Sequence, residues 1–545
     1  MKGEIDMKKI LKYSLVLGVL VSLATTSCVK EVVPTGSSIT KEQANASPTA
    51  LASMTGAIHE YAATANWSAS DFHSFYGYPS LCVIREVWGN DVTCADTSRD
   101  WYQSEAQNQY QSAEQAHMQM IWLIYTKIIA LSNDIIRMFP NLDEINDNNK
   151  GYVGAAYAYR ALCWLDMAQM YEFKENKYTS KPEVVGLTIP LLDENLTEAT
   201  ARYNVRLPKA EILKHIYASL DKALLLLDGF APADKTLPSK AVAYGILARA
   251  KMYEGDYEAA AQAAQDALAA GKFSPLTKAQ WTDVHNGFNS VDTQSSWMLC
   301  TRVSSESSVV KTGIINFTSW MAGETAFGYC GPLGTAFRKV DARFYSQIPD
   351  TDFRKLSWKA PEGSTLEVPY LPASGTSETD YPGSDYLPEY TTIKFRPGKG
   401  NTTDNLVGAA TDFPMMRMEE MKFIIAECEA RKGNAQALVD IVKTRNPEYT
   451  CSLTGTALLS EVFLQKRIEF WGEGIVYFDY KRCPEILQIK RGYEGTNHIE
   501  TARFNCDGLA PWFNLCINKY EADDNKALTD TNNPDPSGTV ELWYE

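Results

Sequence analysis

The sequence predicts a mostly α-helical protein, in which helical hairpins form a scaffold and a loop-rich segment is threaded through it. Apolar residues recur every three or four positions in several long segments, which is the period of one helix face. A Gly-Asp turn at 255–256 joins two such segments. Between 273 and 413 the period fades and Pro, Gly, Ser and Thr become frequent. A tract of that length without periodicity usually carries a function.

The first long helices are expected in the N-terminal half. Six apolar residues share one face of the first: Ile121, Ile124, Ile128, Leu131, Ile135 and Met138. Pro140 ends it, because proline cannot continue a helix. A second stripe runs before Lys174 and consists of Ala156, Tyr159, Cys163, Met167 and Met170. This second stripe predicts a second helix.

The segment from 238 to 271 predicts a helical hairpin. Val242, Ile246, Ala250 and Tyr253 line one face of its first helix, and alanines dominate the second. Gly255 supplies a helix stop and Asp256 a new N-cap. A span of 34 residues with this order resembles a tetratricopeptide hairpin. The hairpins do not follow at a fixed period, so we expect interrupted repeats.

Helical periodicity returns after the loop-rich tract. Met418, Met421, Ile425 and Cys428 form one stripe. Leu464, Ile468, Trp471, Ile475 and Phe478 form another, which predicts a helix across these positions. The tail after Cys483 is expected to be mostly loop.

The N-terminal segment has the composition of an export signal. Basic, apolar and small residues follow in order: Lys8, Lys9 and Lys12, then 14–23, then 24–27. The apolar run is too short to span a bilayer. We expect residues 1–27 to be a lipoprotein signal peptide, Cys28 to be lipidated and residues 28–48 to be a tether. The alternative is an ordinary signal peptide with an incidental Cys28. Translation starts at Met1 or Met7.

Composition narrows the classes of ligand. A net charge of −15 argues against nucleic acid, whose phosphates require a basic surface. The 12 Trp, 29 Tyr and 20 Phe favour a carbohydrate ligand, because sugar faces stack on flat rings. The six histidines lack zinc-site spacing, so no metal or cofactor is expected. Cys82 with Cys94, or Cys506 with Cys516, are open alternatives for disulfides.

Four helical segments carry short motifs in a fixed order. They are Trp122 to Tyr125 with Ile128 and Asn133, residues 156–162 with Tyr171, residues 416–430, and residues 467–482. Asn525 and Asn533-Pro534 extend the series into the tail. Together these motifs resemble those of the SusD/RagB family, the nutrient-uptake outer-membrane lipoproteins of Bacteroidetes. The resemblance covers nearly all of the chain after Cys28.

The resemblance implies a SusD-like fold and a function without chemistry. Residues 49–272 would form an N-terminal tetratricopeptide-like helical region, and residues 273–545 a C-terminal region that includes the insertion 273–413. Such a protein would bind a glycan at the cell surface and deliver it to a SusC-like TonB-dependent transporter. It would be lipid-anchored in the outer membrane and face outward. An oligopeptide ligand, as in RagB-like members, a surface glycosidase and a pure interaction scaffold are the alternatives.

Arginines and carboxylates alternate densely in the C-terminal motifs. The residues are Arg417, Glu420, Glu427, Arg467, Glu469, Glu473, Asp479 and Arg482. On packed helices this pattern indicates hydrogen-bonded ion pairs. Carboxylate catalysis would instead need two acids facing each other across a cleft. We therefore interpret the pattern as a structural network.

Ligand-binding residues are expected in non-helical tracts that combine aromatic rings with Asn, Asp and Arg. Two tracts qualify, 85–110 and 297–329. The expected residues are Trp88, Asn90, Arg99, Asp100, Trp101, Tyr102, Trp297, Trp320 and Tyr329. Trp101 with Tyr102 is the preferred pair, because Arg99 and Asp100 precede it. Trp122, Trp164 and Trp471 are assigned to the core.

Overall fold

A computed structural model describes residues 47–65, 72–375 and 380–545. The predicted signal peptide, Cys28 and almost all of the predicted tether lie outside the described residues. In the part that is described, no helix combines the length and the apolar character that crossing a membrane requires.

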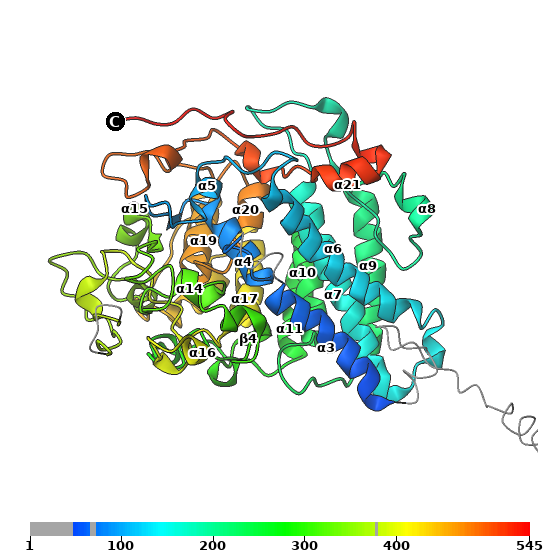
Figure 1. The fold of residues 1–545 in the computed structure, drawn as a ribbon, viewed down its shortest axis with the longest axis horizontal. Helices are drawn as coiled ribbons and strands as arrows, with labels where there is room; N and C mark the ends of the chain where they lie inside the picture. The colour runs from blue at the N-terminus through cyan, green and yellow to red at the C-terminus, as the bar shows by residue number, and fades with distance from the viewer. Residues whose placement is uncertain (1–46, 66–71, 376–379) are drawn as a thin grey trace, which may run out of the picture.

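Long helices occupy one side of the molecule and the irregular tract occupies the other (Figure 1). The N-terminal long helices are α3 (Pro48–Thr64), α6 (Ala116–Arg137), α7 (Asp147–Tyr171), α9 (Lys209–Leu226), α10 (Lys240–Glu254) and α11 (Tyr257–Ala269). The long C-terminal helices are α17 (Met418–Arg431) and α19 (Gly455–Phe470), and the short α18 (Gln436–Lys443) lies between them in the chain. Neighbours in the chain pack on each other, α6 on α7, α7 on α9 and α10 on α11. The pair α11 and α17 joins the two sets, because these helices are also in contact. The predicted helical fold is confirmed.

The helix boundaries follow the local sequence. Helix α6 ends at Arg137, three residues before Pro140, as predicted. Helix α10 ends at Glu254, and its C-cap Gly255 has a φ of +95°, a left-handed conformation that glycine adopts at little cost. The carboxylate of Asp256 then accepts the backbone N–H of Ala259 at 3.2 Å and caps α11. The predicted hairpin is therefore present, whereas its kinship to tetratricopeptide repeats stays a prediction.

Short elements dominate the loop-rich tract and the connections. The short helices are α4 (Tyr78–Val87), α5 (Gln103–Ala106), α8 (Glu198–Ala201), α12 (Lys278–Trp281), α13 (Ser308–Lys311), α14 (Phe317–Met321), α15 (Ala342–Ser346), α16 (Asn405–Gly408), α20 (Tyr477–Arg482) and α21 (Lys519–Asp524). The tail after Cys483 is mostly loop, as expected, and it crosses the top of the molecule in Figure 1.

Three antiparallel strand pairs tie distant segments together. Strand β1 (Val92–Thr93) pairs with β5 (Lys339–Val340), and β2 (Leu187–Pro190) pairs with β3 (Arg206–Pro208). Strand β4 (Trp297–Arg302) pairs with β6 (Asp412–Arg417). The last pair joins the two ends of the segment 303–411, so this segment leaves the scaffold and returns to it at one place.

The helix predicted across 464–478 is interrupted. Helix α19 ends at Phe470 and α20 begins at Tyr477. Between them Gly472 and Gly474 have φ values of +81° and +72°, which no regular helix contains. The apolar stripe continues through the break, because Trp471 and the residues of α20 still face the core. Periodicity alone therefore suggested one helix where the structure has two.

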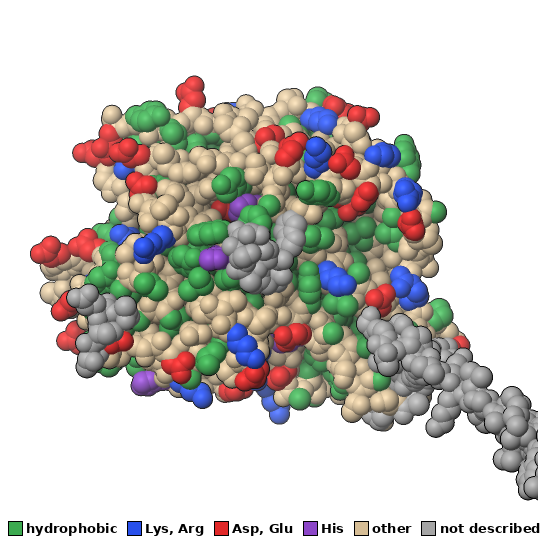
Figure 2. Space-filling model, viewed as in Figure 1, with side chains coloured by type: hydrophobic (Ala, Val, Ile, Leu, Met, Phe, Trp, Pro, Cys, Tyr) green, Lys and Arg blue, Asp and Glu red, His purple; other side chains and the backbone are tan. Residues whose placement is uncertain are grey.

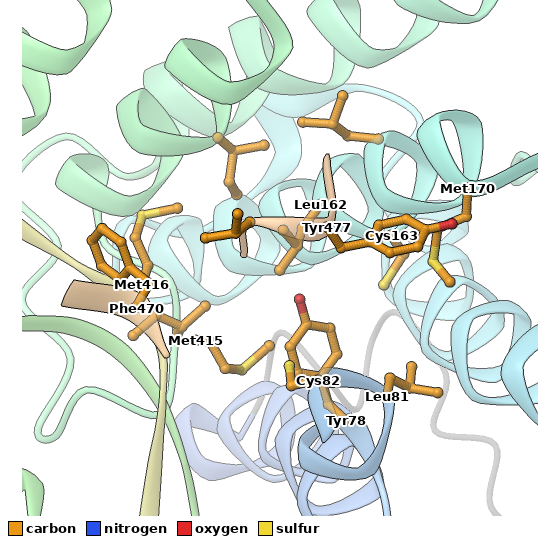
Figure 3. Packing of buried hydrophobic residues seen from close by; sticks show 14 of the residues in the cluster. Tyr78, Leu81, Cys82, Leu162, Cys163, Met170, Met415, Met416, Phe470 and Tyr477 are labelled. Atoms are coloured by element: carbon orange, nitrogen blue, oxygen red, sulfur yellow. The ribbon is translucent and has the colours of Figure 1, made fainter. Parts of the chain in front are cut away.

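The main core lies between the scaffold helices and α4. Figure 3 shows Tyr78, Leu81 and Cys82 of α4 facing side chains of α7, β6 and α20. Trp122, Trp164 and Trp471 are buried, as predicted. All ten cysteines of the described residues are free thiols, so neither disulfide alternative is present there. Seen from outside, hydrophobic side chains gather in the middle of one face (Figure 2).

Candidate functional site

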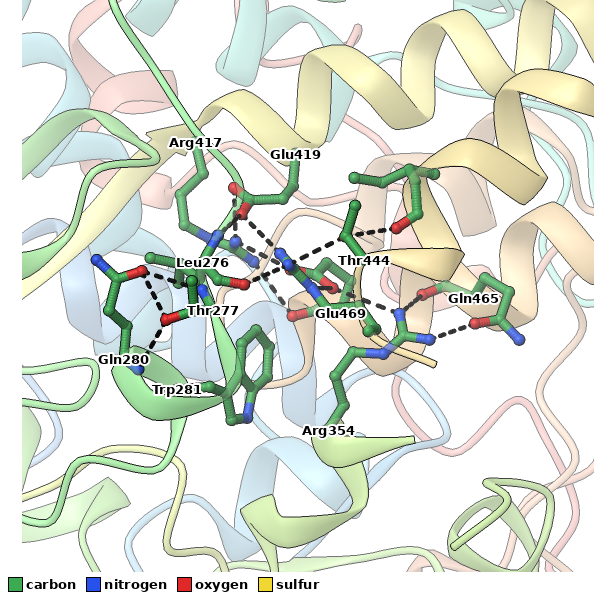
Figure 4. A network of polar contacts seen from close by, with 12 residues as sticks. Leu276, Thr277, Gln280, Trp281, Arg354, Arg417, Glu419, Thr444, Gln465 and Glu469 are labelled. Carbon is green, nitrogen blue, oxygen red and sulfur yellow. Dashed lines mark hydrogen bonds and ion pairs between the residues drawn. The ribbon is translucent and has the colours of Figure 1, made fainter. Parts of the chain in front are cut away.

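The arginine and carboxylate motifs form a buried ion-pair network, as predicted (Figure 4). Arg445 contacts Glu419 at 2.6 Å and Glu469 at 3.0 Å. Arg417 reaches Glu469 at 3.0 Å and Glu473 at 2.8 Å. These side chains have no exposed surface. Burial alone would raise the pKa of Glu469, but the guanidinium groups of Arg445 and Arg417 hold it well below its usual range.

A second set of pairs links α17, α19 and α20. Arg482 contacts Glu427 at 2.6 Å and Asp479 at 2.8 Å, and Lys466 contacts Asp479 at 2.7 Å. Burial by itself would raise the pKa of Glu427. The positive charges of Arg482 and Lys466 outweigh this effect, and the pKa is lowered to about 2. The carboxylates of both sets are neutralised inside the fold. They therefore join helices and do not form an accessible acid pair.

A surface pocket of about 290 Å³ lies at the irregular side of the molecule. It brings together three of the predicted residues, Arg99, Trp101 and Tyr329. Its other lining residues are Ser98, Ile314, Phe327, Gly328, Leu333 and Gly334. Two loops build most of it, one between β1 and α5 and the other after α14. The first lies within the predicted tract 85–110, in which Trp101 and Tyr102 are the preferred pair.

Aromatic rings are stacked inside this pocket wall. The ring of Trp101 stacks on the imidazole of His73 at a centroid distance of 4.7 Å. That imidazole hydrogen-bonds the hydroxyl of Tyr329, whose ring stacks on Trp320 at 4.1 Å. Burial lowers the pKa of His73, so its ring is neutral at neutral pH. Trp101 and Tyr329 are partly exposed, and the rings behind them fix their orientation.

Asp100 and Arg338 hold the two loops together beneath the rings. The Asp100 carboxylate accepts the backbone N–H groups of Ala95 at 2.7 Å and of Tyr102 at 3.1 Å. It also accepts two hydrogen bonds from the guanidinium of Arg338. That guanidinium lies over the rings of Tyr102 and Trp320, at 5.2 Å and 5.8 Å. Because Arg338 follows the second loop, the pair fixes one loop against the other.

Five predicted residues are more buried than we expected. Trp88, Asp100, Tyr102, Trp297 and Trp320 have at most 4% of their surface exposed. The four aromatic rings and the Asp100 carboxylate contact other protein groups, so these five side chains have almost no surface that a ligand could touch in this structure. Asp100, Tyr102 and Trp320 support the pocket from behind.

The remaining predicted residues lie outside the pocket. Trp297 begins β4 and its ring packs near Phe288, at 6.2 Å. Trp88 is packed against Tyr477, at 5.8 Å. Asn90 donates to the carbonyl of Gln488 at 2.8 Å and so ties its loop to the tail. The expectation of a ligand role for these three residues therefore finds no support in their positions.

The expected residues did not include several members of the site. His73 and Arg338 organise the rings, and Ile314 and Phe327, which lie inside the predicted tract 297–329, line the pocket. A signal for His73 exists, because it stands in the aromatic run from Phe72 to Tyr78. Arg338 carries no such signal, since its role depends on an aspartate 238 positions away.

Other hollows are larger but poorer in aromatic rings. Two pockets, of about 790 and 730 Å³, are each lined by a single Phe among their described residues. A third pocket, of about 530 Å³, has no aromatic side chain among its described lining residues. Among the residues that the structure describes, no group of three His, Cys, Asp or Glu side chains is placed to hold a metal ion. Figure 2 shows histidine and hydrophobic side chains together near the middle of the face, with basic side chains beside them.

This chain is similar to the SusD family in part of its sequence and to SusD-like proteins in its fold. Residues 325–536 match the family model of the SusD family. The fold is similar to a SusD-like carbohydrate binding protein from Bacteroides vulgatus, at 19% identity and a TM-score of 0.67, covering 89% of this chain and 98% of that chain. It is also similar to surface glycan-binding protein A from Bacteroides fluxus, at 16% identity and a TM-score of 0.59, covering 89% and 98%. No curated protein matches.

The helical scaffold with one loop-rich insertion is therefore a SusD-like fold. A SusD superfamily protein from Bacteroides thetaiotaomicron shares this fold over 91% of this chain and 100% of its own, at 18% identity and a TM-score of 0.64. The match over residues 325–536 and the shared fold agree with the resemblance to the SusD/RagB family that the helical motifs predicted.

Proposed function

We propose that this protein binds a glycan in the pocket around Trp101, without chemically changing it. The observation that supports the proposal is the partly exposed Trp101 ring, held by its stack on His73 beside Tyr329 and Arg99. A flat ring presents an apolar face to the C–H groups of a sugar, and polar groups at its edge bind hydroxyls. The match to the SusD family model and the SusD-like fold support the same function.

We further propose that the glycan is handed to a SusC-like TonB-dependent transporter. In this proposal, residues 49–272 form the N-terminal helical region and residues 273–545 carry the ligand-binding insertion. Cys28 carries the lipid that holds the protein on the outer membrane, facing outward. Labelling cells with a radioactive fatty acid should mark the wild-type protein but not the Cys28→Ala variant. Co-purification of a TonB-dependent transporter with the native protein would support the hand-over.

The binding function is tested with purified protein and a panel of oligosaccharides. Calorimetry should detect binding to at least one of them, and chromatography after prolonged incubation should recover that oligosaccharide at its original length. Shortened products would establish a glycosidase instead. Binding of oligopeptides with no binding of any glycan would favour the RagB-like alternative.

A further inference from the structure

The pocket around Trp101 has a lining that is mostly uncharged but contains one arginine. Among its described lining residues Arg99 alone carries a charge at neutral pH. The others are apolar, glycine, Ser98 or Tyr329, and the Tyr329 hydroxyl is already bonded to His73. A neutral sugar offers many hydroxyls and therefore needs several polar partners. This pocket supplies few of them and one exposed guanidinium.

The Arg99 guanidinium lacks a carboxylate partner among the described residues. One of its nitrogens donates to the backbone carbonyl of Leu333, which leaves its other N–H groups available. Asp100 follows it in the chain but is buried and bound by Arg338 and two backbone N–H groups. The exposed Asp96 accepts a hydrogen bond from Gln103 at 3.1 Å and forms no ion pair with Arg99. Among the described residues, no carboxylate therefore balances this positive charge at the pocket.

We propose that the pocket takes an anionic glycan, whose carboxylate or sulfate group is bound by Arg99 while a sugar ring lies on Trp101. This inference rests on the proposed glycan-binding function and specifies its ligand class. The guanidinium matches a carboxylate or sulfate because it donates two parallel hydrogen bonds. The net charge of −15 disfavours anions over the whole surface, so selection must come from this local group.

The test compares acidic glycans with matched neutral ones. The protein from residue 28 to its C-terminus is applied to a glycan array. The array carries oligogalacturonides, oligoglucuronides and sulfated galactans beside the corresponding neutral galactans and glucans. At least one acidic glycan should bind more tightly than its neutral counterpart. Its affinity should fall as the salt concentration rises from about 0.05 M to about 0.5 M, because salt screens exposed charges.

Three variants assign the effect to the guanidinium. Arg99→Gln should weaken binding of the acidic glycan about 10-fold or more, since a charge-assisted hydrogen bond is lost. Arg99→Lys should retain part of the affinity, because it keeps the charge and loses the paired donors. Arg343→Gln is the matched control. Arg343 is also exposed and donates to a backbone carbonyl, that of Lys490, yet it does not line the pocket.

Each outcome decides between the two proposals. If neutral glycans bind as well as acidic ones and Arg99→Gln binds like wild type, the anionic class is wrong while glycan binding stands. If no glycan binds at all, both proposals fail. The inference would also be wrong if the protein bound oligoglutamate and bound no acidic glycan, because the ligand of the pocket would then be an acidic peptide. Equal losses in Arg99→Gln and Arg343→Gln would show a general charge effect and overturn the role of Arg99.

Discussion

At the scale of single residues, Trp101 and its neighbours divide into those that face the pocket and those that hold it. Arg99, Trp101 and Tyr329 line the hollow, whereas Asp100 and Tyr102 lie behind it. Adjacent positions in an irregular loop thus point to opposite sides of the pocket wall. The residue types in this loop indicated a binding site, but they did not indicate which side chains reach the surface.

Replacing Trp101 by Ala should weaken glycan binding by about 1 kcal/mol or more, because the stacking surface is removed. Calorimetry with the glycan identified in the panel measures the effect. Tyr544→Ala is the control, since Tyr544 is 76% exposed and does not line the pocket. Wild-type affinity in a folded Trp101→Ala protein would remove this ring from the site.

Replacing Asp100 by Ala should lower the free energy of unfolding by about 3 to 5 kcal/mol, because the buried guanidinium of Arg338 loses its partner. Glycan affinity should fall as well, since both loops rest on this pair. Urea denaturation measures the stability. Asp96→Ala, at an exposed position of the same loop, should change it by no more than about 0.5 kcal/mol. Equal stabilities of the two variants would contradict the role of the pair.

At the scale of elements, the break between α19 and α20 shows where tertiary contacts override periodicity. The apolar stripe from Leu464 to Phe478 has helical spacing, yet the chain leaves the helix at Trp471. A glycine at 474 allows the backbone to approach Cys82 of α4 closely, and its N–H donates to Glu86 at 2.7 Å. A contact with a distant helix therefore decides the geometry of this turn.

Replacing Gly474 by Ala should destabilise the fold more than the same change at Gly433. Both glycines have positive φ, +72° and +84°, so both variants bear the backbone strain. An added Cβ at 474 would lie 2.5 Å from the Cα of Cys82, whereas nothing lies within 4 Å at 433. We expect an additional loss of about 1 to 3 kcal/mol at 474, measured by urea denaturation. Equal losses would show that the close approach is unimportant.

At the scale of the whole molecule, segments from both ends of the chain meet around α4. Glu86 of this helix binds the turn before α20, and Arg85 contacts Asp166 of α7 at 2.9 Å. The buried network of Arg417, Arg445 and Glu469 joins β6 to the later helices. Arg354 and Lys394 of the insertion contact Glu469 at 3.4 Å and Glu473 at 2.7 Å, so the insertion shares polar contacts with α19 and the turn that follows it.

Replacing Glu86 by Gln should reveal a pH-dependent part of the stability. Burial raises the pKa of Glu86 to about 8, whereas in the unfolded chain a glutamate titrates near about 4.3. Because the folded protein binds this proton more tightly than the unfolded chain does, protonation of Glu86 stabilises the fold. This stabilisation is complete below the pKa of the unfolded chain and is lost as the pH rises toward 8. The loss is at most about 1.4 kcal/mol per pH unit.

Urea denaturation of both proteins at pH 5, 6, 7 and 8 measures this contribution. The stability of wild type relative to Glu86→Gln should decrease steadily over this range, because only wild type must hold a proton on the buried carboxyl. Glu494→Gln removes an exposed carboxyl and should leave the pH profile unchanged. A difference between wild type and Glu86→Gln that is constant with pH would contradict the raised pKa.

Local signals in the sequence predicted most of the long helices, the resemblance to the SusD/RagB family and the tract that holds the candidate site. These depend on local signals, such as the stripes on α6 and α7, the stop at Gly255 and the order of motifs along the chain. The tertiary structure alone decided which rings are exposed and which residues meet. His73, Trp101, Tyr329 and Arg338 come from separate segments, and their contacts depend on how the loops pack. Periodicity describes one segment at a time, and burial is a property of all of them together.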